Sequence, residues 1–166
     1  MTNDVKAEVI GLGEYRISRD TSTILMCIGL GSCVSVCLYD SKQRMAGLAH
    51  VVLPVARGSA GRESKDAKYA DTGVPRLIEE MCSMGARKLS LTAKISGGAS
   101  LITAPGFSNR FNTGEENVLA VQRALEMQGI KLIGKDVGGH HGRTVKLVVA
   151  TGAVMVLSAG KSLLEL

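Results

Sequence analysis

Short apolar segments, separated by glycine-rich or charged turns, follow one another along most of the chain. The runs 23–28 and 46–53 are rich in β-forming residues and end at glycine or proline, which predicts buried strands. The segment 88–95 alternates apolar and polar residues, as a half-buried strand does. The run 33–39 is apolar but short, so its pattern leaves a strand and a buried helix both open.

Both ends of the chain predict further strands. Residues 7–19 carry apolar side chains interrupted by glycine and indicate an interrupted strand or a hairpin. Near the other end, 130–137 predicts a strand, and 144–150 is expected to pair back with it as a hairpin across the glycine-rich turn 138–142. A last short strand is expected over 153–157.

Two segments instead show the 3.6-residue period of amphipathic helices. In 69–84 the apolar positions at helical spacing are Val74, Leu77, Ile78 and Met81. Pro75 is compatible with the first turn of this helix, and Gly85 would end it. The spacing of Thr113 and Glu116 is a capping-box signature, which predicts a second helix from there to about Met127.

The predicted strands outnumber the helices, and no linker divides the chain. This favours one α/β or α+β layered domain over residues 1–166, with a mixed, mainly antiparallel sheet and two main helices. Aromatic residues make up only 3% of the chain, so the core is expected to consist of aliphatic side chains and methionine. Residues 55–66 predict a mobile surface loop that could cover the site discussed below, and 101–112 a loop that holds Phe107 and Phe111.

Composition and charge exclude several classes of function. The net charge of +5 makes nucleic acid a conceivable partner, but basic residues form no run longer than two and no aromatic residues interleave with them, so we expect no nucleic-acid binding. A mildly basic surface can equally favour an acidic protein partner. No apolar run approaches the roughly 20 residues of a membrane-spanning helix, and the polar start of the chain is unlike a signal peptide, which predicts a cytoplasmic protein with reduced thiols. Neither paired C-x-x-C spacing nor a complete nucleotide-binding glycine motif is present, so we expect no metal or cofactor.

One stretch carries candidate chemistry. Cys33 follows directly on the glycine turn 29–32, and His50 lies near the end of a predicted neighbouring strand. Such a pair can act as nucleophile and general base, and backbone amides of the turn at Gly31 and Ser32 could hold an oxyanion. The alternative is that Cys33 is an ordinary small buried residue and His50 a core histidine.

The remaining cysteines and histidines give weaker signals. Cys37 has no adjacent glycine turn and is expected in the core, and Cys82 is expected to be structural. His140 and His141 lie in a glycine turn without a nearby cluster of carboxylates or thiols, which favours a role in the turn over metal binding.

Six separated motifs, in order, resemble one known family, the CheD chemoreceptor glutamine deamidases of bacterial and archaeal chemotaxis. The motifs are IGLGEY (10–15), GLGSCV (29–34), AHVVLP (49–54), KYADT (68–72), AKISGGA (93–99) and DVGG (136–139) followed by Gly142-Arg143. The resemblance implies a compact α/β sandwich and an enzyme that converts receptor glutamines to glutamate, in some members with hydrolysis of glutamyl methyl esters. It also implies methyl-accepting chemotaxis receptors as substrate and a CheC-type phosphatase of the response regulator as partner.

The resemblance assigns the nucleophile to Cys33 and the histidine to His50, but the chain departs from the family in two places. The family's third catalytic residue, a threonine, matches Cys27, whose thiol is a poorer hydrogen bonder than a hydroxyl. Thr23 or Ser35 could take over its role. In the segment 113–117, a basic residue is expected beside the asparagine and is absent.

These departures leave alternatives to deamidation. In one, the site has weakened and the protein is a regulatory binding module that stimulates a CheC-type phosphatase. In another, Cys27 and Cys33 form a redox pair that switches the enzyme off, since their six-residue separation across a turn permits contact.

Overall fold

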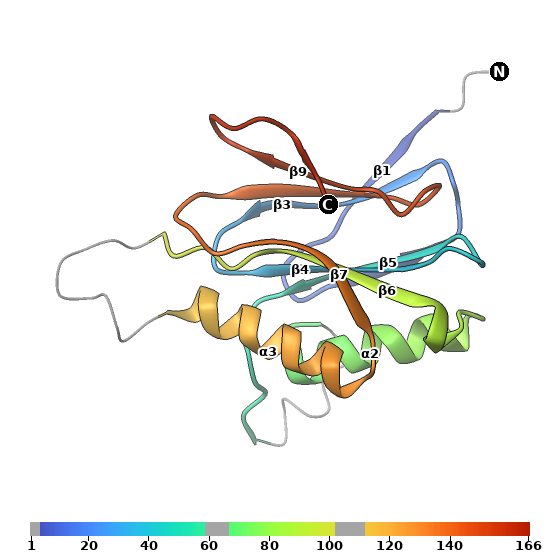
Figure 1. Cartoon of the computed structure of the whole chain (residues 1–166), viewed down its shortest axis with the longest axis horizontal. Coiled ribbons are helices and arrows are strands. Elements are labelled where there is room, and N and C mark those ends of the chain that lie inside the picture. Colours follow the sequence, from blue (N-terminus) through green and yellow to red (C-terminus); the bar gives the residue numbers. More distant parts are fainter. Residues whose placement is uncertain (1–3, 59–66, 102–111) are drawn as a thin grey trace, which may run out of the picture.

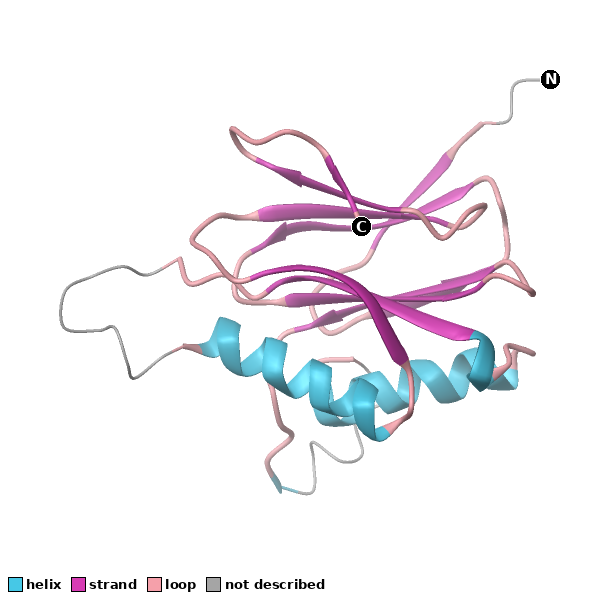
Figure 2. Cartoon of the chain, in the orientation of Figure 1, coloured by secondary structure: helices cyan, strands magenta, loops and turns pink. Residues whose placement is uncertain are grey.

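In the described part of the chain, two five-stranded sheets stack on each other and two helices form a third layer. A computed structural model describes residues 4–58, 67–101 and 112–166 of the chain. Both helices lie on the outer face of one sheet, and the second sheet covers its other face (Figures 1 and 2). This arrangement confirms the predicted layered α+β architecture with two main helices.

Each sheet is mixed but mainly antiparallel, as expected. The upper sheet of Figure 1 has the order β1 (Lys6–Val9), β3 (Thr23–Leu30), β8 (Arg143–Val148), β9 (Val154–Ser158) and β10 (Leu164–Glu165). The helix-covered sheet has the order β2 (Tyr15–Ser18), β5 (Met45–Val51), β4 (Val34–Asp40), β6 (Leu91–Gly97) and β7 (Lys131–Val137). Only β1–β3 and β6–β7 pair in parallel among the described strands.

The helices close the core of the second sheet. Helix α2 (Ala70–Ser83) packs on β5, helix α3 (Thr113–Met127) packs on β4 and β7, and a short 3₁₀ turn, η1 (Lys88–Ser90), precedes β6. Because side chains alternate along a strand, the even positions Val34 and Val36 of β4 face the helices. Cys33 and Cys37 belong instead to the core between the two sheets. Coverage on both faces explains why 33–39 reads as an unbroken apolar run, and it settles that segment as a strand.

The hairpin predicted for 130–150 is wrong, and of the two alternatives for 7–19, an interrupted strand or a hairpin, the hairpin does not form. The segment 7–19 forms β1 and β2, which belong to different sheets, and β7 and β8 are likewise in different sheets. In each case the glycine-containing connection carries the chain from one layer to the other instead of folding it back on its neighbour. Strand β8 forms its hairpin with β9. The apolar pattern predicts that a strand is buried, but not which sheet it joins.

The helix-start predictions also need correction. Thr113 is the first residue of α3 and Asn112 precedes it as the N-cap residue, with its side-chain amide donating to Glu115, so the predicted Thr113–Glu116 capping box does not form. Pro75 lies inside α2, beyond its first turn. It is tolerated there at the cost of one intrahelical hydrogen bond, because proline has no backbone N–H.

Parts of two predicted loops, residues 59–66 and the segment 102–111 with Phe107 and Phe111, lie outside the described residues. Within the described parts of the chain, neither helix has the length and apolar character needed to cross a bilayer.

Candidate active site

The pairing of β4 with β5 places Cys33 and His50 on the same face of one sheet. Ser35 is the direct partner of His50 in this antiparallel pair, and Cys33 lies two residues before Ser35. Residues two apart share a face, so Cys33 is the diagonal neighbour of His50, a relation that typically spans about 7–8 Å between backbones and less between side chains. Both side chains face the layer between the sheets, where Cys33 is partly exposed and His50 is buried. A thiol and an imidazole are thus available to each other at one edge of this layer.

His50 is held in one orientation by the main chain. Its Nδ1 lies 3.1 Å from the carbonyl oxygen of Ile10, the residue that follows β1. A carbonyl only accepts, so Nδ1 carries the proton in the neutral ring and Nε2 presents a lone pair. Nε2 is buried and has no hydrogen-bond partner among the described residues. It is therefore the nitrogen that can take a proton from a thiol.

The electrostatic surroundings keep His50 neutral. Burial lowers the pKa of His50 below its ordinary value, while the contact with Ile10 and the charge of Glu14 act in the opposite direction. Burial also raises the pKa of the Cys33 thiol, although the backbone N–H of Cys33 itself partly offsets this by stabilising the thiolate. Burial thus favours the neutral form of both groups, an arrangement that suits a general base more than a preformed ion pair.

The turn before Cys33 is fixed by its carbonyl groups. The carbonyl oxygens of Gly31 and Cys33 accept hydrogen bonds from the backbone N–H groups of Ala99 and Gly98, both at 2.8 Å. The carbonyl between them, that of Ser32, accepts from the side-chain Nδ2 of Asn117 at 2.9 Å. In a trans peptide the C=O and N–H point in opposite directions, so the N–H groups of Ser32 and Cys33 face away from these anchors. The anchored carbonyls thus fix the orientation of both N–H groups.

This close packing requires glycine at position 97. Gly97 has a φ of +120°, a conformation that L side chains rarely adopt, and a Cβ there would clash with the carbonyl oxygen of Cys33. The end of β6 can therefore approach the candidate nucleophile only through a residue without a side chain.

The residue at the family's third catalytic position lies in the same layer. Cys27 of β3 is fully buried between the sheets. Its thiol pKa is raised far above the ordinary value, first by burial and then by its neighbours Cys37 and Cys33. The Nδ1 of His50 is satisfied by Ile10 and not by this thiol.

Neither of the two side chains suggested as replacements is hydrogen-bonded to His50 within the described structure. Ser35 donates its hydroxyl to the carbonyl of Ser96 at 3.1 Å. Thr23 begins β3, and its strand partner is Lys6. The contact of His50 Nδ1 is instead with the backbone carbonyl of Ile10.

Of the other sequence candidates, Cys37 lies in the core as expected. It is buried between the sheets, and burial raises the pKa of its thiol to about 12. Cys82 is partly buried on α2. His140 contacts the carbonyl of Ser100 at 2.8 Å, and His141 lies near the ammonium of Lys161. Among residues 4–58, 67–101 and 112–166, no three His, Cys, Asp or Glu side chains gather in a way that could hold a metal ion.

Sequence reasoning missed two groups at this site, the carbonyl of Ile10 and the side chain of Asn117. A main-chain carbonyl leaves no signature in the residue type, so no pattern could have revealed the first. The second, Asn117, lies in the segment 113–117 that the family resemblance singled out for its missing basic residue, and the asparagine itself was the available signal.

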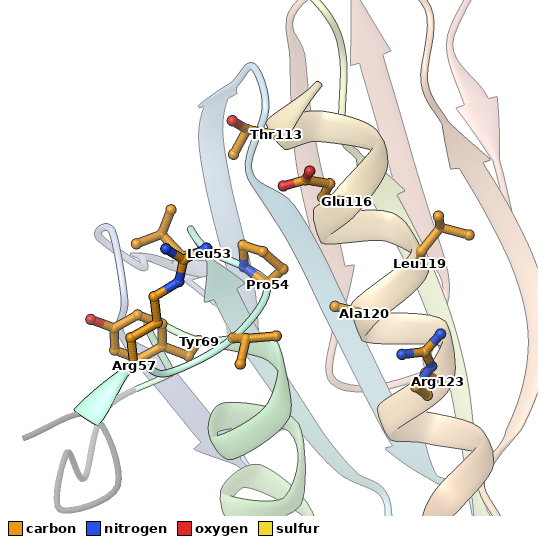
Figure 3. Close-up of a pocket in the computed structure, with 10 residues that line it drawn as sticks. Leu53, Pro54, Arg57, Tyr69, Thr113, Glu116, Leu119, Ala120 and Arg123 are labelled. Carbon is orange, nitrogen blue, oxygen red and sulfur yellow. The ribbon is translucent and has the colours of Figure 1, made fainter. Parts of the chain in front are cut away.

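A groove lies on the helix side of the same sheet (Figure 3). It has a volume of about 660 Å³ and runs between the segment after β5 and helix α3, with Pro54 lying across from Ala120. Arg57 and Arg123 are the cationic residues in its walls. The described residues that line it include neither Cys33 nor His50, so this groove is separate from the thiol–imidazole pair.

Comparison with known sequences shows the same family that the six motifs resemble. Residues 52–158 match the family described as "CheD chemotactic sensory transduction". The chain is 39% identical to the "Probable chemoreceptor glutamine deamidase CheD" of Symbiobacterium thermophilum over 164 residues, which cover 99% of both chains. It is 42% identical to the "Chemoreceptor glutamine deamidase CheD" of Thermotoga maritima, covering 92% of each chain, and 41% identical to the "Probable chemoreceptor glutamine deamidase CheD" of Thermococcus kodakarensis, covering 92% of this chain and 94% of that one.

Among solved structures, the Bacillus licheniformis hypothetical protein YfiH resembles the chain with a TM-score of 0.49 and 12% identity. The match covers 81% of this chain and 60% of that protein.

Proposed function

Because the chain belongs to the CheD family, we propose that it is a protein-glutamine deamidase that converts glutamines of chemotaxis receptors to glutamate. The observation that carries the proposal is the placement of Cys33 and His50 on one face of paired strands, with the Nε2 lone pair of His50 unengaged. The family supplies the substrate class, and the site supplies a nucleophile and a base for acyl transfer.

In the proposed reaction, Nε2 of His50 takes the thiol proton of Cys33 as the sulfur attacks the side-chain carbonyl of glutamine. The amide N–H groups of Ser32 and Cys33 hold the tetrahedral oxyanion. The imidazolium then returns its proton to the leaving nitrogen, ammonia departs and a thioester remains. A water molecule, deprotonated by the same imidazole, attacks the thioester, and cleavage of the C–S bond releases glutamate and the thiol.

The same steps would hydrolyse a glutamyl methyl ester, with methanol as the leaving group instead of ammonia. Receptor tails that face the cytoplasm would be the natural substrate for a protein in that compartment. Regulation by a CheC-type phosphatase, the partner that the family resemblance implies, stays a prediction.

The decisive experiment replaces the sulfur. Purified protein is incubated with the cytoplasmic fragment of a methyl-accepting receptor, and ammonia release is measured together with peptide mass spectra that locate new glutamates. Wild-type protein and a Cys82→Ala control should both be active, because Cys82 lies on α2, away from the site. Cys33→Ala should keep its fold and lose turnover, and more than about a tenth of wild-type activity in this variant would contradict the assignment.

A further inference from the structure

We propose that Asn117 is a positioning residue for this reaction, whose side-chain amide joins the turn that carries the nucleophile to the segment that carries the base. The catalytic role of Asn117 rests on the proposed function, but its hydrogen bonds are observed independently of that function. Asn117 lies in the first part of α3 and is fully buried.

The amide group of Asn117 bridges two chain segments. Its Nδ2 donates to the carbonyl of Ser32 at 2.9 Å and to the carbonyl of Val52 at 2.8 Å. Both partners are acceptors, so only the NH₂ end of the amide can face them, and its orientation is fixed by chemistry. Ser32 is the residue before Cys33, and Val52 follows His50 by two positions. One side chain therefore ties together the two segments that carry the reacting groups, just beyond the last paired residues of β4 and β5.

Asn117 also controls the direction of one peptide unit. The carbonyls of residues 31 and 33 accept from the backbone N–H groups of residues 99 and 98, whereas the carbonyl of Ser32 accepts from a side chain, that of Asn117. The bond to the Ser32 carbonyl turns the N–H of Cys33 toward the opposite side of the same peptide unit. That N–H is one of the proposed oxyanion donors, and it also stabilises the thiolate. Without Asn117 the peptide unit between Ser32 and Cys33 could rotate.

The start of helix α3, which carries Asn117, packs closely on residues 98 and 99. A Cβ on Gly114 would lie 2.5 Å from the carbonyl oxygen of Ala99 and 2.6 Å from that of Gly98, so the start of α3 packs directly on the segment that anchors the turn. The Oδ1 of Asn117, by contrast, is buried without a hydrogen-bond partner in the described structure. A buried, unpaired acceptor lowers stability, and departures of this kind concentrate at functional sites.

Two variants test the proposal. Asn117→Asp keeps the shape but places a carboxylate against two carbonyls, and Asn117→Ala removes the group without adding charge. Gln122→Glu is the matched control, since it makes the same amide-to-acid change on a partly exposed position of the same helix. For each protein, kcat and KM are measured on the receptor fragment, and the folded fraction at the assay temperature is measured by circular dichroism.

Both Asn117 variants should lose at least 10-fold in kcat per folded molecule with KM changed less than about threefold, because misplacing an oxyanion donor affects the transition state more than substrate binding. A loss of kcat that only follows the folded fraction, or a change confined to KM, would overturn the proposal. Gln122→Glu should match the wild type.

A second readout does not depend on deamidation. The rate of iodoacetamide labelling of Cys33 is measured against pH, with peptide mapping to separate it from the other thiols. Loss of the aligned N–H should shift the Cys33 profile to higher pH in both Asn117 variants. The titratable groups in the same layer, His50 of β5, Cys27 of β3 and Cys37 of β4, are unchanged in these proteins.

The two readouts separate the two proposals. If wild-type protein released no ammonia, the proposed function would fail, and the labelling profile would still decide about Asn117. A shift in both variants supports the positioning role, and an unshifted profile in folded protein rejects it.

Discussion

Removing the thiol of Cys27 tests whether the residue at the family's third catalytic position has any catalytic role in this protein. In the structure, Nδ1 of His50 is already held by the carbonyl of Ile10 at 3.1 Å. Cys27 contributes a fully buried side chain to the core between the sheets. We therefore expect Cys27→Ala to change stability and not chemistry.

The magnitude follows from burial. Loss of one buried sulfur forfeits about 1 kcal/mol of transfer free energy, and the residual cavity adds a similar amount, so the free energy of unfolding should fall by about 1–2 kcal/mol. Activity per folded molecule should stay within about threefold of wild type. By comparison, disturbing the group that orients the histidine of a serine-protease triad lowers kcat by about 10⁴-fold.

The assay combines urea unfolding, which gives the stability change, with ammonia release at a temperature where more than 90% of each variant is folded. Cys27→Thr, which restores the residue expected from the family, is the companion variant. Its hydroxyl enters an apolar layer, so it should lower stability without raising kcat. A tenfold loss of kcat in Cys27→Ala, or a tenfold gain in Cys27→Thr, would show that this position does act on His50 and would refute the argument from Ile10.

Two further predictions concern packing and pH. Gly114→Ala should lower the free energy of unfolding by about 1–3 kcal/mol, because its Cβ would meet two carbonyl oxygens at 2.5 and 2.6 Å, and a raised unfolding temperature would contradict this. Burial lowers the pKa of His50, so below pH 6.5 the unfolded chain binds a proton that the folded protein resists. Stability should therefore be constant at higher pH and fall as the pH drops from about 7.5 to 5.5 in urea titrations. The pKa of His141 is also lowered, so part of this pH dependence comes from that residue. In His50→Asn, the loss of stability with falling pH should shrink to the part contributed by His141. An unchanged pH dependence of stability would refute the assignment to His50.

The sequence predicted the strand of His50 over 46–53, but it left 33–39 open between a strand and a buried helix. The structure settles this second segment as β4, which pairs with β5 across the polar turn 41–44. Once they pair in antiparallel fashion, Cys33 near one end of its strand and His50 near the far end of the next come together by geometry alone.

What the sequence could not supply is which layer each strand joins. The chain crosses between sheets after β1 and after β7, where composition suggested turns back. These crossings matter for the site: the first brings the carbonyl of Ile10 over His50, and the second follows the parallel pair in which β6 ends at Gly97, beside Cys33. Contacts of this kind join residues distant in sequence through backbone groups. Because every residue has these groups, the sequence shows only where a glycine is present and not which contact it permits.

The hydrogen-bonded frame around Cys33 and His50 is electrically neutral. Its members are the backbone carbonyl of residue 10, the backbone amides of residues 98 and 99, and the uncharged side chain of Asn117. Among the causes identified for the pKa shifts of the two reacting groups, Glu14 is the one charged residue, and its effect on His50 ranks after burial and the backbone contact. Within the described structure no cation contributes to lowering the pKa of the thiol, so in the proposed reaction the activation of Cys33 depends on where the imidazole and the amide N–H groups are held. A site built in this way is sensitive to small displacements of the turn, the strand end and the helix, which is why a single buried amide that touches two of them can govern the rate.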